Sequence, residues 1–257
     1  MVRRFLVLVL LAGSLAAPST QAQPAPAAAG APKVEAVDPA AVQALKDMGT
    51  YLQSLKRFHV ETEVTGERVL ADGQKLQHTA TARLDVARPD KLRAAMRSAT
   101  AQRVIFHDGK TVTLYSPAQK YYSTVDLTAT LGELVNRLEE RYAVELPLSD
   151  LFLFGTPAAP LDKLESAMNA GQDVIDGDLC DHYAFRQAKV DWQIWISAAA
   201  GKPLPRKVVI TSRADEARPQ SVSLIDWNLK PGFTDAVFKF TPPKGSTKVD
   251  VVPRKTK

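Results

Sequence analysis

The chain has 257 residues and a formal net charge of +5, from 33 Lys and Arg against 28 Asp and Glu. Charges of both signs are spread along it without the basic stripe that nucleic-acid binding requires, so we expect no nucleic-acid partner. The single cysteine, Cys180, excludes an intrachain disulfide.

Residues 1–22 have the pattern of an export signal. Arg3-Arg4 precede an apolar run from Phe5 to Ala17, and Thr20-Gln21-Ala22 supplies a small-residue cleavage site. Ser14 stands where a lipidated cysteine would be needed. We therefore expect an exported, soluble, non-lipidated protein with no transmembrane segment after signal removal.

The remaining chain divides into three parts by composition. Residues 23–37 are rich in Ala and Pro and predict a flexible linker. Residues 38–253 predict one domain, and residues 254–257 a basic tail.

The domain begins with a helix and continues as a meander of strands. Asp38 and Pro39 are a favoured helix cap and first helical residue, and apolar residues at helical spacing continue the helix to Lys56. From Phe58 the apolar period changes from 3.6 to two. Six or so antiparallel strands follow, joined by short turns such as Asp108-Gly109.

Short helices are predicted in the middle of the chain. Thr130 and Glu133 have capping-box spacing and precede an apolar stripe. Residues 148–154 form a second piece that ends in the uniformly apolar Leu151–Phe154, so we expect this segment to be buried or to line an apolar space. Leu161 to Met168 predicts one more short helix.

Residues 172–212 predict four further strands. The first turn is Asp176-Gly177, an arrangement typical of a tight hairpin. Trp192 and Trp195 fall on opposite faces of one strand, so neither face of this sheet is expected to be simply solvated. Gln220 to Leu229 and a short run at residues 249–252 predict the last strands.

These elements predict an α+β fold. We expect a single large curved antiparallel sheet, a half-open β-barrel of about ten to eleven strands, with helices on its concave face. The space between helices and sheet is then the natural pocket.

The sequence contains no local pattern for a metal, a cofactor or catalysis. The histidines form no metal-binding pair, and nucleotide-binding glycine motifs and nucleophile elbows are absent. Cys180 and His182 share a strand face and would be a nucleophile pair only if the thiol were accessible, whereas a buried cysteine is the simpler interpretation. Asp176, Asp178 and Asp181 lack the spacing of a calcium loop. We therefore expect a non-catalytic protein.

Three segments resemble a bacterial family of predicted periplasmic proteins of unknown function. They are DGDLCDHYAFRQAKVDWQIWI with the following PLPRKVVIT, FHDGKTVTLYSPAQKYYSTV, and the closing FKFTPPKG. The family is similar in fold to the periplasmic lipoprotein-carrier superfamily, which implies a half-open barrel whose cavity takes acyl chains. Four residues are candidates for the single cavity arginine of those carriers: Arg83, Arg93, Arg97 and Arg103.

Pattern and resemblance together predict a periplasmic binding or carrier protein for a lipid, an acyl chain or another hydrophobic ligand. The expected apolar cavity residues are Leu131, Leu134, Val135, Leu138, Leu151, Phe152, Phe154, Trp192 and Trp195. One alternative is that these side chains only fill the core. Another is an envelope sensor or assembly module that binds a protein partner, such as an envelope protein or lipoprotein.

Overall fold

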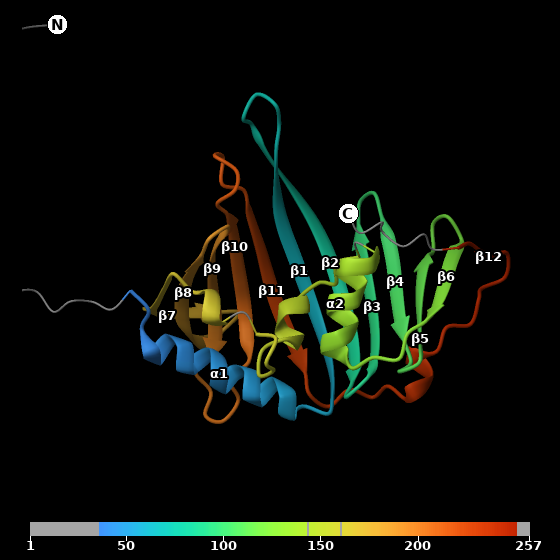
Figure 1. Ribbon diagram of the computed structural model, residues 1–257, viewed down its shortest axis with the longest axis horizontal. Helices are drawn as coiled ribbons and strands as arrows, with labels where there is room; N and C mark the ends of the chain where they lie inside the picture. Colours follow the sequence, from blue (N-terminus) through green and yellow to red (C-terminus); the bar gives the residue numbers. More distant parts are fainter. Residues whose placement is uncertain (1–35, 143, 160, 251–257) are drawn as a thin grey trace, which may run out of the picture. The chain divides into compact units, whose positions relative to one another are not determined.

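The computed structural model describes residues 36–142, 144–159 and 161–250. The predicted signal peptide, most of the linker, the basic tail and residues 251–252 of the last predicted strand lie outside these residues. Residues 35–257 form one compact unit by chain contacts, and its α-helices and strands are labelled in Figure 1.

This unit contains two α-helices, three short 3-10 turns and twelve strands in its described part. The helices are α1 (Pro39–Ser54) and α2 (Leu131–Tyr142), and the 3-10 turns are η1 (Ser149–Phe152), η2 (Leu161–Lys163) and η3 (Asp235–Phe238). The first six strands are β1 (Arg57–Val69), β2 (Lys75–Ala87), β3 (Lys91–Ser98), β4 (Gln102–His107), β5 (Thr111–Ser116) and β6 (Tyr121–Asp126). The last six are β7 (Ser166–Ile175), β8 (Asp178–Gln187), β9 (Val190–Ser197), β10 (Pro205–Ser212), β11 (Gln220–Asn228) and β12 (Thr247–Lys248).

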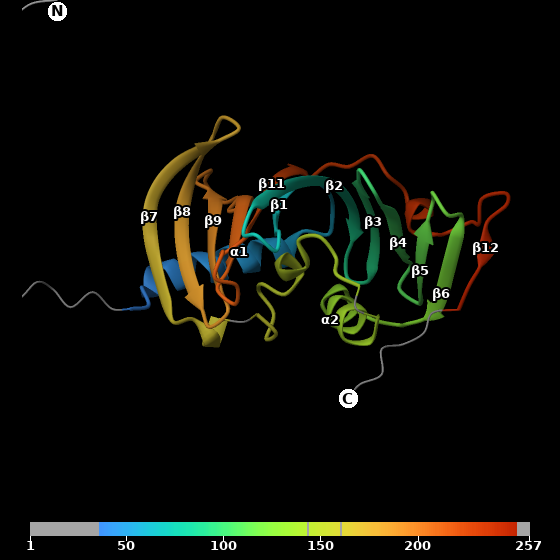
Figure 2. The ribbon, with the colours of Figure 1, turned by 90° about the horizontal axis from the view of Figure 1, so that it is seen from above.

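All twelve strands belong to one open, curved sheet. Their order is β12-β6-β5-β4-β3-β2-β1-β11-β10-β9-β8-β7, antiparallel throughout except for the parallel pair β12–β6. The central pairing joins β1 to β11, from His59 opposite Asn228 to Gly66 opposite Ser221. Figure 2 shows the sheet arching over α1, η1 and α2, which lie inside its curve. The predicted fold class is therefore confirmed. The last strand is displaced from its predicted position, because β12 occupies Thr247–Lys248 and the described residues 249 and 250 are not in a strand.

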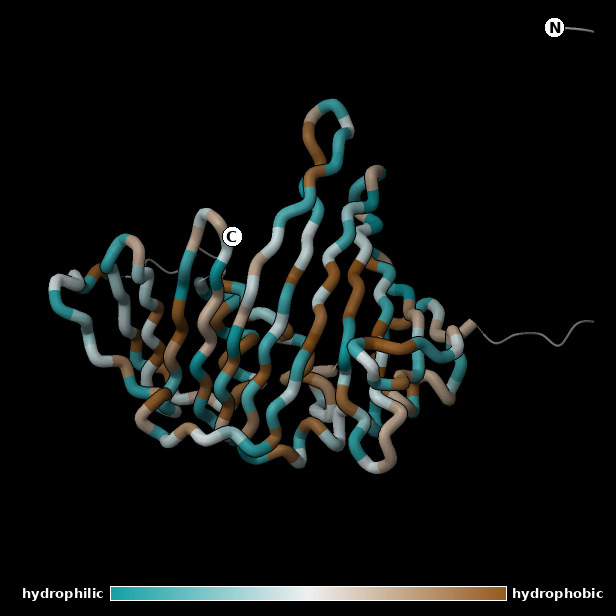
Figure 3. Tube along the Cα trace, turned by 180° about the vertical axis from the view of Figure 1, so that it is seen from behind, coloured by the Kyte–Doolittle hydropathy of each residue, from teal (hydrophilic) through white to brown (hydrophobic). Residues whose placement is uncertain are grey.

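Turn residues determine where the strands reverse. Asp176 and Gly177 both have left-handed backbone angles, φ 48° and 85°, as a two-residue hairpin of this twist requires. In the β4–β5 turn Gly109 is left-handed, and the Asp108 carboxylate accepts hydrogen bonds from the backbone amides of Lys110 and Thr111. Seen from behind, hydrophilic and hydrophobic residues alternate along many strands, as expected when their two faces differ (Figure 3).

Helix α1 packs against the concave face with an unusually close backbone contact. Its predicted cap is present, because the Asp38 side chain accepts from the Ala40 amide at 2.8 Å. A Cβ atom on Gly49 would lie 2.4 Å from the backbone nitrogen of Gly155. Glycine therefore sets the distance at which α1 meets the segment after η1.

Helix α2 starts as the capping box predicts. Glu133 accepts from the amide and hydroxyl of Thr130 at 2.8 and 3.0 Å, which lowers the pKa of its carboxyl. The amide of Leu131 donates to the Pro89 carbonyl, so the helix start is fixed to the β2–β3 turn. The ring nitrogens of the buried His107 face the carbonyl oxygens of Thr111 and Ala129, which connects β4 to the approach of α2.

The predicted helix from Leu161 to Met168 is wrong. Only Leu161–Lys163 turns, and β7 begins at Ser166. The backbone amide of Ala167 donates to Ala36 and its carbonyl accepts from Asp38, while β7 pairs with β8 on its other side. These backbone hydrogen bonds outweigh the weak helical spacing of the segment.

The C-terminal segment crosses the convex face. The Phe240 ring lies 5.1–5.3 Å from the rings of Phe106, Tyr115 and Tyr122. Before it, Asp235 in η3 forms ion pairs with Lys91 and Arg57. The closing Phe-Lys-Phe motif thus covers strands β4 to β6 from outside.

We expect Gly49→Ala to destabilise the protein by about 1–3 kcal/mol, because its methyl group would overlap the backbone at Gly155. The matched control is Gly132→Ala in α2, where an added Cβ would meet its nearest neighbours at 3.9 Å. That variant should be neutral or more stable by up to about 1 kcal/mol. Urea unfolding measures both, and equal effects of the two substitutions would contradict the close contact.

Asp235 should make stability depend on acid pH. Lys91 first, and then Arg57, lower the pKa of its carboxyl from 3.8 to about 2. The stabilisation is therefore complete above pH 3.8 and is lost as the pH falls through 2. Asp235→Asn should lower the urea midpoint at pH 6, and its difference from the wild type should shrink towards pH 2. A difference that does not change with pH would show that these ion pairs contribute nothing.

Candidate functional site

A groove of about 660 Å³ lies between the concave face of the sheet and the segment from α2 to residue 154. Its floor comes from strands β1, β2, β3, β8, β9, β10 and β11, and its other wall from α2, residues 144–151 and Phe154. The floor residues are Val64, Ala80, Thr81, Ala82, Met96, Gln187, Val190, Trp192, Ile194, Val208, Ile210, Ser221 and Ser223. Its volume falls within the range of about 300–1,000 Å³ that is usual for small-molecule sites.

The groove wall is mostly apolar but remains partly open to water. Val64, Met96, Trp192 and Val208 keep intermediate exposure, and Ile210 is 36 % exposed although it lies on the concave side. Apolar surface left in water costs roughly 25 cal/mol per Å², which a ligand that covers it would recover. The arrangement can therefore bind an apolar molecule.

Trp192 occupies one end of the groove in an aromatic cluster. Its ring stacks on Phe185 with centroids 4.2 Å apart, and the Phe154 ring lies 6.2 Å away. Its indole nitrogen is buried and has no hydrogen-bond partner among the described residues. The indole N–H is thus a buried donor whose hydrogen-bonding capacity is unused within the described residues.

Of the nine side chains expected in an apolar cavity, four line the groove: Val135, Leu151, Phe154 and Trp192. Four others contribute to the same core without lining it: Leu131, Leu134, Leu138 and Phe152. Leu138 instead lines a smaller space of about 240 Å³ between α2 and strands β4 to β6, which meets the groove at Val144. The structure therefore divides the expected set between groove and packed core.

Trp195, the ninth side chain expected in the cavity, lies outside both the groove lining and the main core. It packs with Ile175, Cys180 and Val209 in a second cluster, separate from the main core. The His182 ring stacks on it at 4.0 Å, and the Lys207 ammonium lies 4.5 Å from its ring centroid. Because side chains alternate along β9, Trp195 points to the convex face and is covered there by its neighbours.

The charged residues that line the groove are all acidic. Glu139, Glu145 and Asp150 lie on its helical side, and none has an ion-pair partner within the described part of the chain. Neighbouring protein atoms raise the pKa of the Asp150 carboxyl by desolvation, although solvent still reaches the residue. Asp150 is therefore a solvent-exposed acidic side chain of the groove lining.

The sequence did not reveal the groove floor. Ala80, Ala82, Ser221 and Ser223 are small residues at alternate positions of two strands, and they leave space where larger side chains would fill the core. Their alternation is visible in the sequence, but their common face became clear only through the register β2–β1–β11.

None of the four arginines considered from the family resemblance lines the groove. Arg83 pairs with Glu61 at 3.1 Å and Arg93 with Asp85 at 3.2 Å, whereas Arg97 and Arg103 are exposed. The salt bridges of Arg83 and Arg93 belong to the convex face of β1, β2 and β3.

Cys180 and His182 share a face of β8, and no hydrogen bond joins them within the described residues. Cys180 is completely buried, and burial first, followed by the nearby Asp178 charge, raises the pKa of its thiol. The Nε2 atom of His182 hydrogen-bonds with the Gln193 side chain at 2.9 Å. Within the described residues no cluster of His, Cys, Asp or Glu could hold a metal ion. In the same residues, no helix is both long and apolar enough to cross a membrane.

The family described as "Predicted periplasmic protein (DUF2092)" matches residues 41–252, which confirms the resemblance seen in the sequence. No curated protein matches the chain significantly. Among solved structures, LprF from Mycobacterium bovis shares 13 % identity with a TM-score of 0.47, covering 82 % of this chain and 100 % of that one. The LolA superfamily protein NE2245 from Nitrosomonas europaea shares 12 % identity, with a TM-score of 0.36 and coverage of 78 % and 97 %. A chain of the Pseudomonas aeruginosa MucA/MucB complex shares 11 %, with a TM-score of 0.39 and coverage of 79 % and 61 %.

We expect Cys180 to react slowly with iodoacetamide in the folded protein and rapidly after denaturation, because a buried thiol of raised pKa supplies little thiolate. His182→Ala should not slow the reaction of the folded protein. Rapid labelling of the native protein at neutral pH that His182→Ala abolishes would instead indicate an activated nucleophile.

Proposed function

We propose that this chain, which belongs to the DUF2092 family of predicted periplasmic proteins and is periplasmic like that family, binds or carries a hydrophobic molecule in the groove. The observation that carries the proposal is the groove itself, about 660 Å³ of mainly apolar space between sheet and helices. An acyl chain or a similarly apolar body suits a lining that is mainly apolar. The role is one of binding and needs no catalytic residue.

The groove charges narrow the class of ligand. A head group that emerges beside Glu139, Glu145 and Asp150 is repelled if it is anionic and tolerated if it is neutral or cationic. A neutral lipophilic fluorophore is therefore a better first probe than a fatty acid. N-phenyl-1-naphthylamine is a suitable fluorophore for this test.

The test fills the groove and measures the affinity of that probe. Ala80→Phe places a large side chain on the floor and should weaken binding at least ten-fold. Thr79→Phe is the matched control, because this exposed neighbour on the same strand does not line the groove. It should bind like the wild type.

Two outcomes would contradict the proposal. In the first, the wild type does not bind the fluorophore. In the second, Ala80→Phe binds as tightly as Thr79→Phe while both variants unfold at the wild-type urea concentration. The second outcome would mean that binding occurs outside the groove.

A second candidate role is binding of an envelope protein along the free edge of the sheet. Strand β7 is the last in the sheet order, and beyond Ala167, which pairs with Ala36 and Asp38, its outer edge has no neighbouring strand within the described residues. Met168 and Val174 on β7 and Leu179 on β8 are 50–60 % exposed. An extended partner segment can add a strand to such an edge. Crosslinking in envelope fractions separates the roles, since a stoichiometric protein partner without a bound lipid would favour this candidate.

A further inference from the structure

Arg88 is a partly buried arginine whose charge nothing in the described chain balances. It follows β2, and its Nε atom is buried without a hydrogen-bond partner. Three other partly buried arginines each have a carboxylate: Arg57 with Asp235, Arg93 with Asp85, and Arg206 with Asp178. Burial also lowers the pKa of the Arg88 guanidinium, with no neighbouring acid to oppose it. A buried charge without a partner is costly, and an anion from outside the chain would offset that cost.

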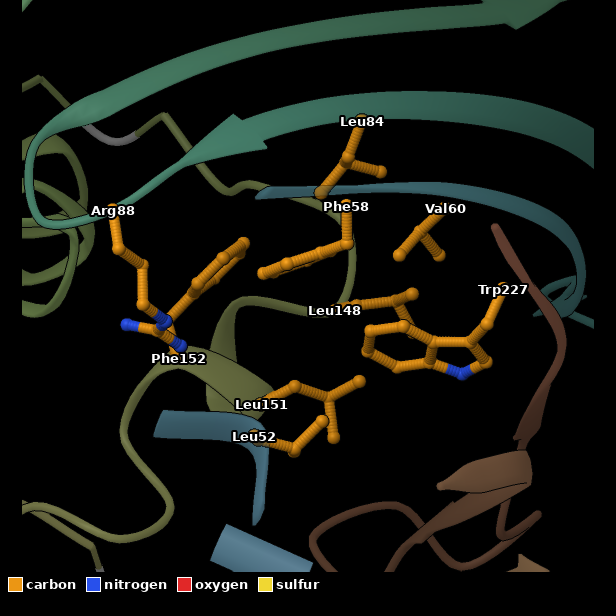
Figure 4. A pocket seen from close by; sticks show the side chains of 9 residues that line it. All are labelled: Leu52, Phe58, Val60, Leu84, Arg88, Leu148, Leu151, Phe152 and Trp227. Atoms are coloured by element: carbon orange, nitrogen blue, oxygen red, sulfur yellow. The ribbon is translucent and has the colours of Figure 1, made fainter. Parts of the chain in front are cut away.

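Arg88 lies at the boundary between a small apolar space and an open cleft. Figure 4 shows it at the edge of side chains that are otherwise apolar or aromatic, among them Phe58, Leu84 and Phe152. Arg88 and Phe152 also line a cleft of about 660 Å³ on the other side. Residues 151–154 separate this cleft from the apolar groove. Leu151 and Phe154 line the groove, whereas Phe152 and Leu153 line the cleft.

A second cation enters the same cleft. The backbone amide of Arg88 donates to the Lys56 carbonyl at 2.8 Å, so the two residues are hydrogen-bonded neighbours, and both line the cleft. Lys56 has no ion pair within the described residues. The single acidic residue of the cleft lining, Glu133, is engaged by the amide and hydroxyl of Thr130.

The cleft walls are held in place by hydrogen bonds between its elements. Gln53 of α1 donates through Nε2 to the carbonyls of Phe152 and Phe154 at 3.2 and 2.7 Å. The Leu131 amide of α2 donates to the Pro89 carbonyl at 3.0 Å. The cations therefore extend from a fixed framework in which the ends of α1 and β2 meet the start of α2.

We propose that this cleft is an anion site that binds a phosphate group through Arg88 and Lys56. A guanidinium presents several donors in a plane and matches phosphate oxygens, and an ammonium adds a second charge. The phosphate belongs either to a small phosphorylated molecule or to a lipid head group. The inference does not depend on the apolar groove, whose charged lining has the opposite sign.

Isothermal titration calorimetry at low ionic strength tests this site with two probes, inorganic phosphate and dihexanoyl phosphatidylglycerol below its micelle concentration. The wild type should bind at least one of them, with chloride at equal ionic strength as the blank. Arg88→Met should weaken that binding at least ten-fold and Lys56→Met at least three-fold. The control is Arg97→Met, an exposed arginine that does not line the cleft, and it should bind like the wild type.

The two probes identify the source of the phosphate. Binding of inorganic phosphate indicates a small phosphorylated molecule, and binding of the lipid alone indicates a head group. The proposal is overturned if the wild type binds neither probe. It is also overturned if Arg88→Met binds a probe with wild-type affinity. If Arg88→Met does not fold, Lys56→Met decides, and undiminished binding by that variant overturns the proposal. Fluorophore binding in the apolar groove should persist in every variant, which keeps the two sites experimentally distinct.

Discussion

The structure depends on burial of the concave face of a sheet that does not close. Its two edge strands, β7 and β12, do not pair with each other. Strand pairing alone therefore leaves the concave face without cover. Helix α1 and the α2–η1 segment cover it and complete the main core. Their mutual position depends on the contact of Gly49 with Gly155 and on the Gln53 side chain between two carbonyls. Without this cover, the apolar side chains on the concave face of the sheet would face water.

The same constraint produces the groove. The covering segment is short, and small residues such as Ala80 and Ser223 face it on the central strands. A fully packed interior would need larger side chains at these positions. Incomplete cover over small floor residues leaves a partly exposed apolar space, and this is the physical basis for the proposed ligand.

Much of the fold follows from local sequence signals. Asp176-Gly177 and the Thr130/Glu133 pair act over a few residues, and both form as their patterns predict. The helix predicted from Leu161 to Met168 is wrong because the backbone of this segment pairs with Ala36 on one side and with β8 on the other. The spacing of apolar residues within the segment does not reveal these hydrogen bonds to other segments. Long-range backbone pairing decided its conformation.

The candidate site was less predictable for a related reason. Apolar periodicity identifies residues that leave water, but it does not distinguish a packed core from a cavity wall, as Leu134 and Val135 show. It also gives no sign of which sheet face is concave, so Trp195 was grouped with Trp192. Arg88 carries no motif, and its significance appears only when the carboxylates around the other arginines are known.

The arrangement of charge gives the two spaces different chemistry. Acidic side chains line the apolar groove, whereas Arg88 and Lys56 line the cleft on the other side of residues 151–154. These two environments lie on opposite sides of a single short segment that includes Leu151 and Phe152. A molecule bound on either side would contact this segment, and its position is thus central to both proposed sites.

The most direct test of the central claim is the identity of what the groove contains. Protein purified from the periplasm without detergent can be extracted with chloroform and methanol, and the extract analysed by mass spectrometry. We predict a molecule with an apolar body and a neutral or cationic head group, in near-stoichiometric amount. An extract that is empty in repeated preparations, from protein that also fails to take up added lipid, would contradict the account.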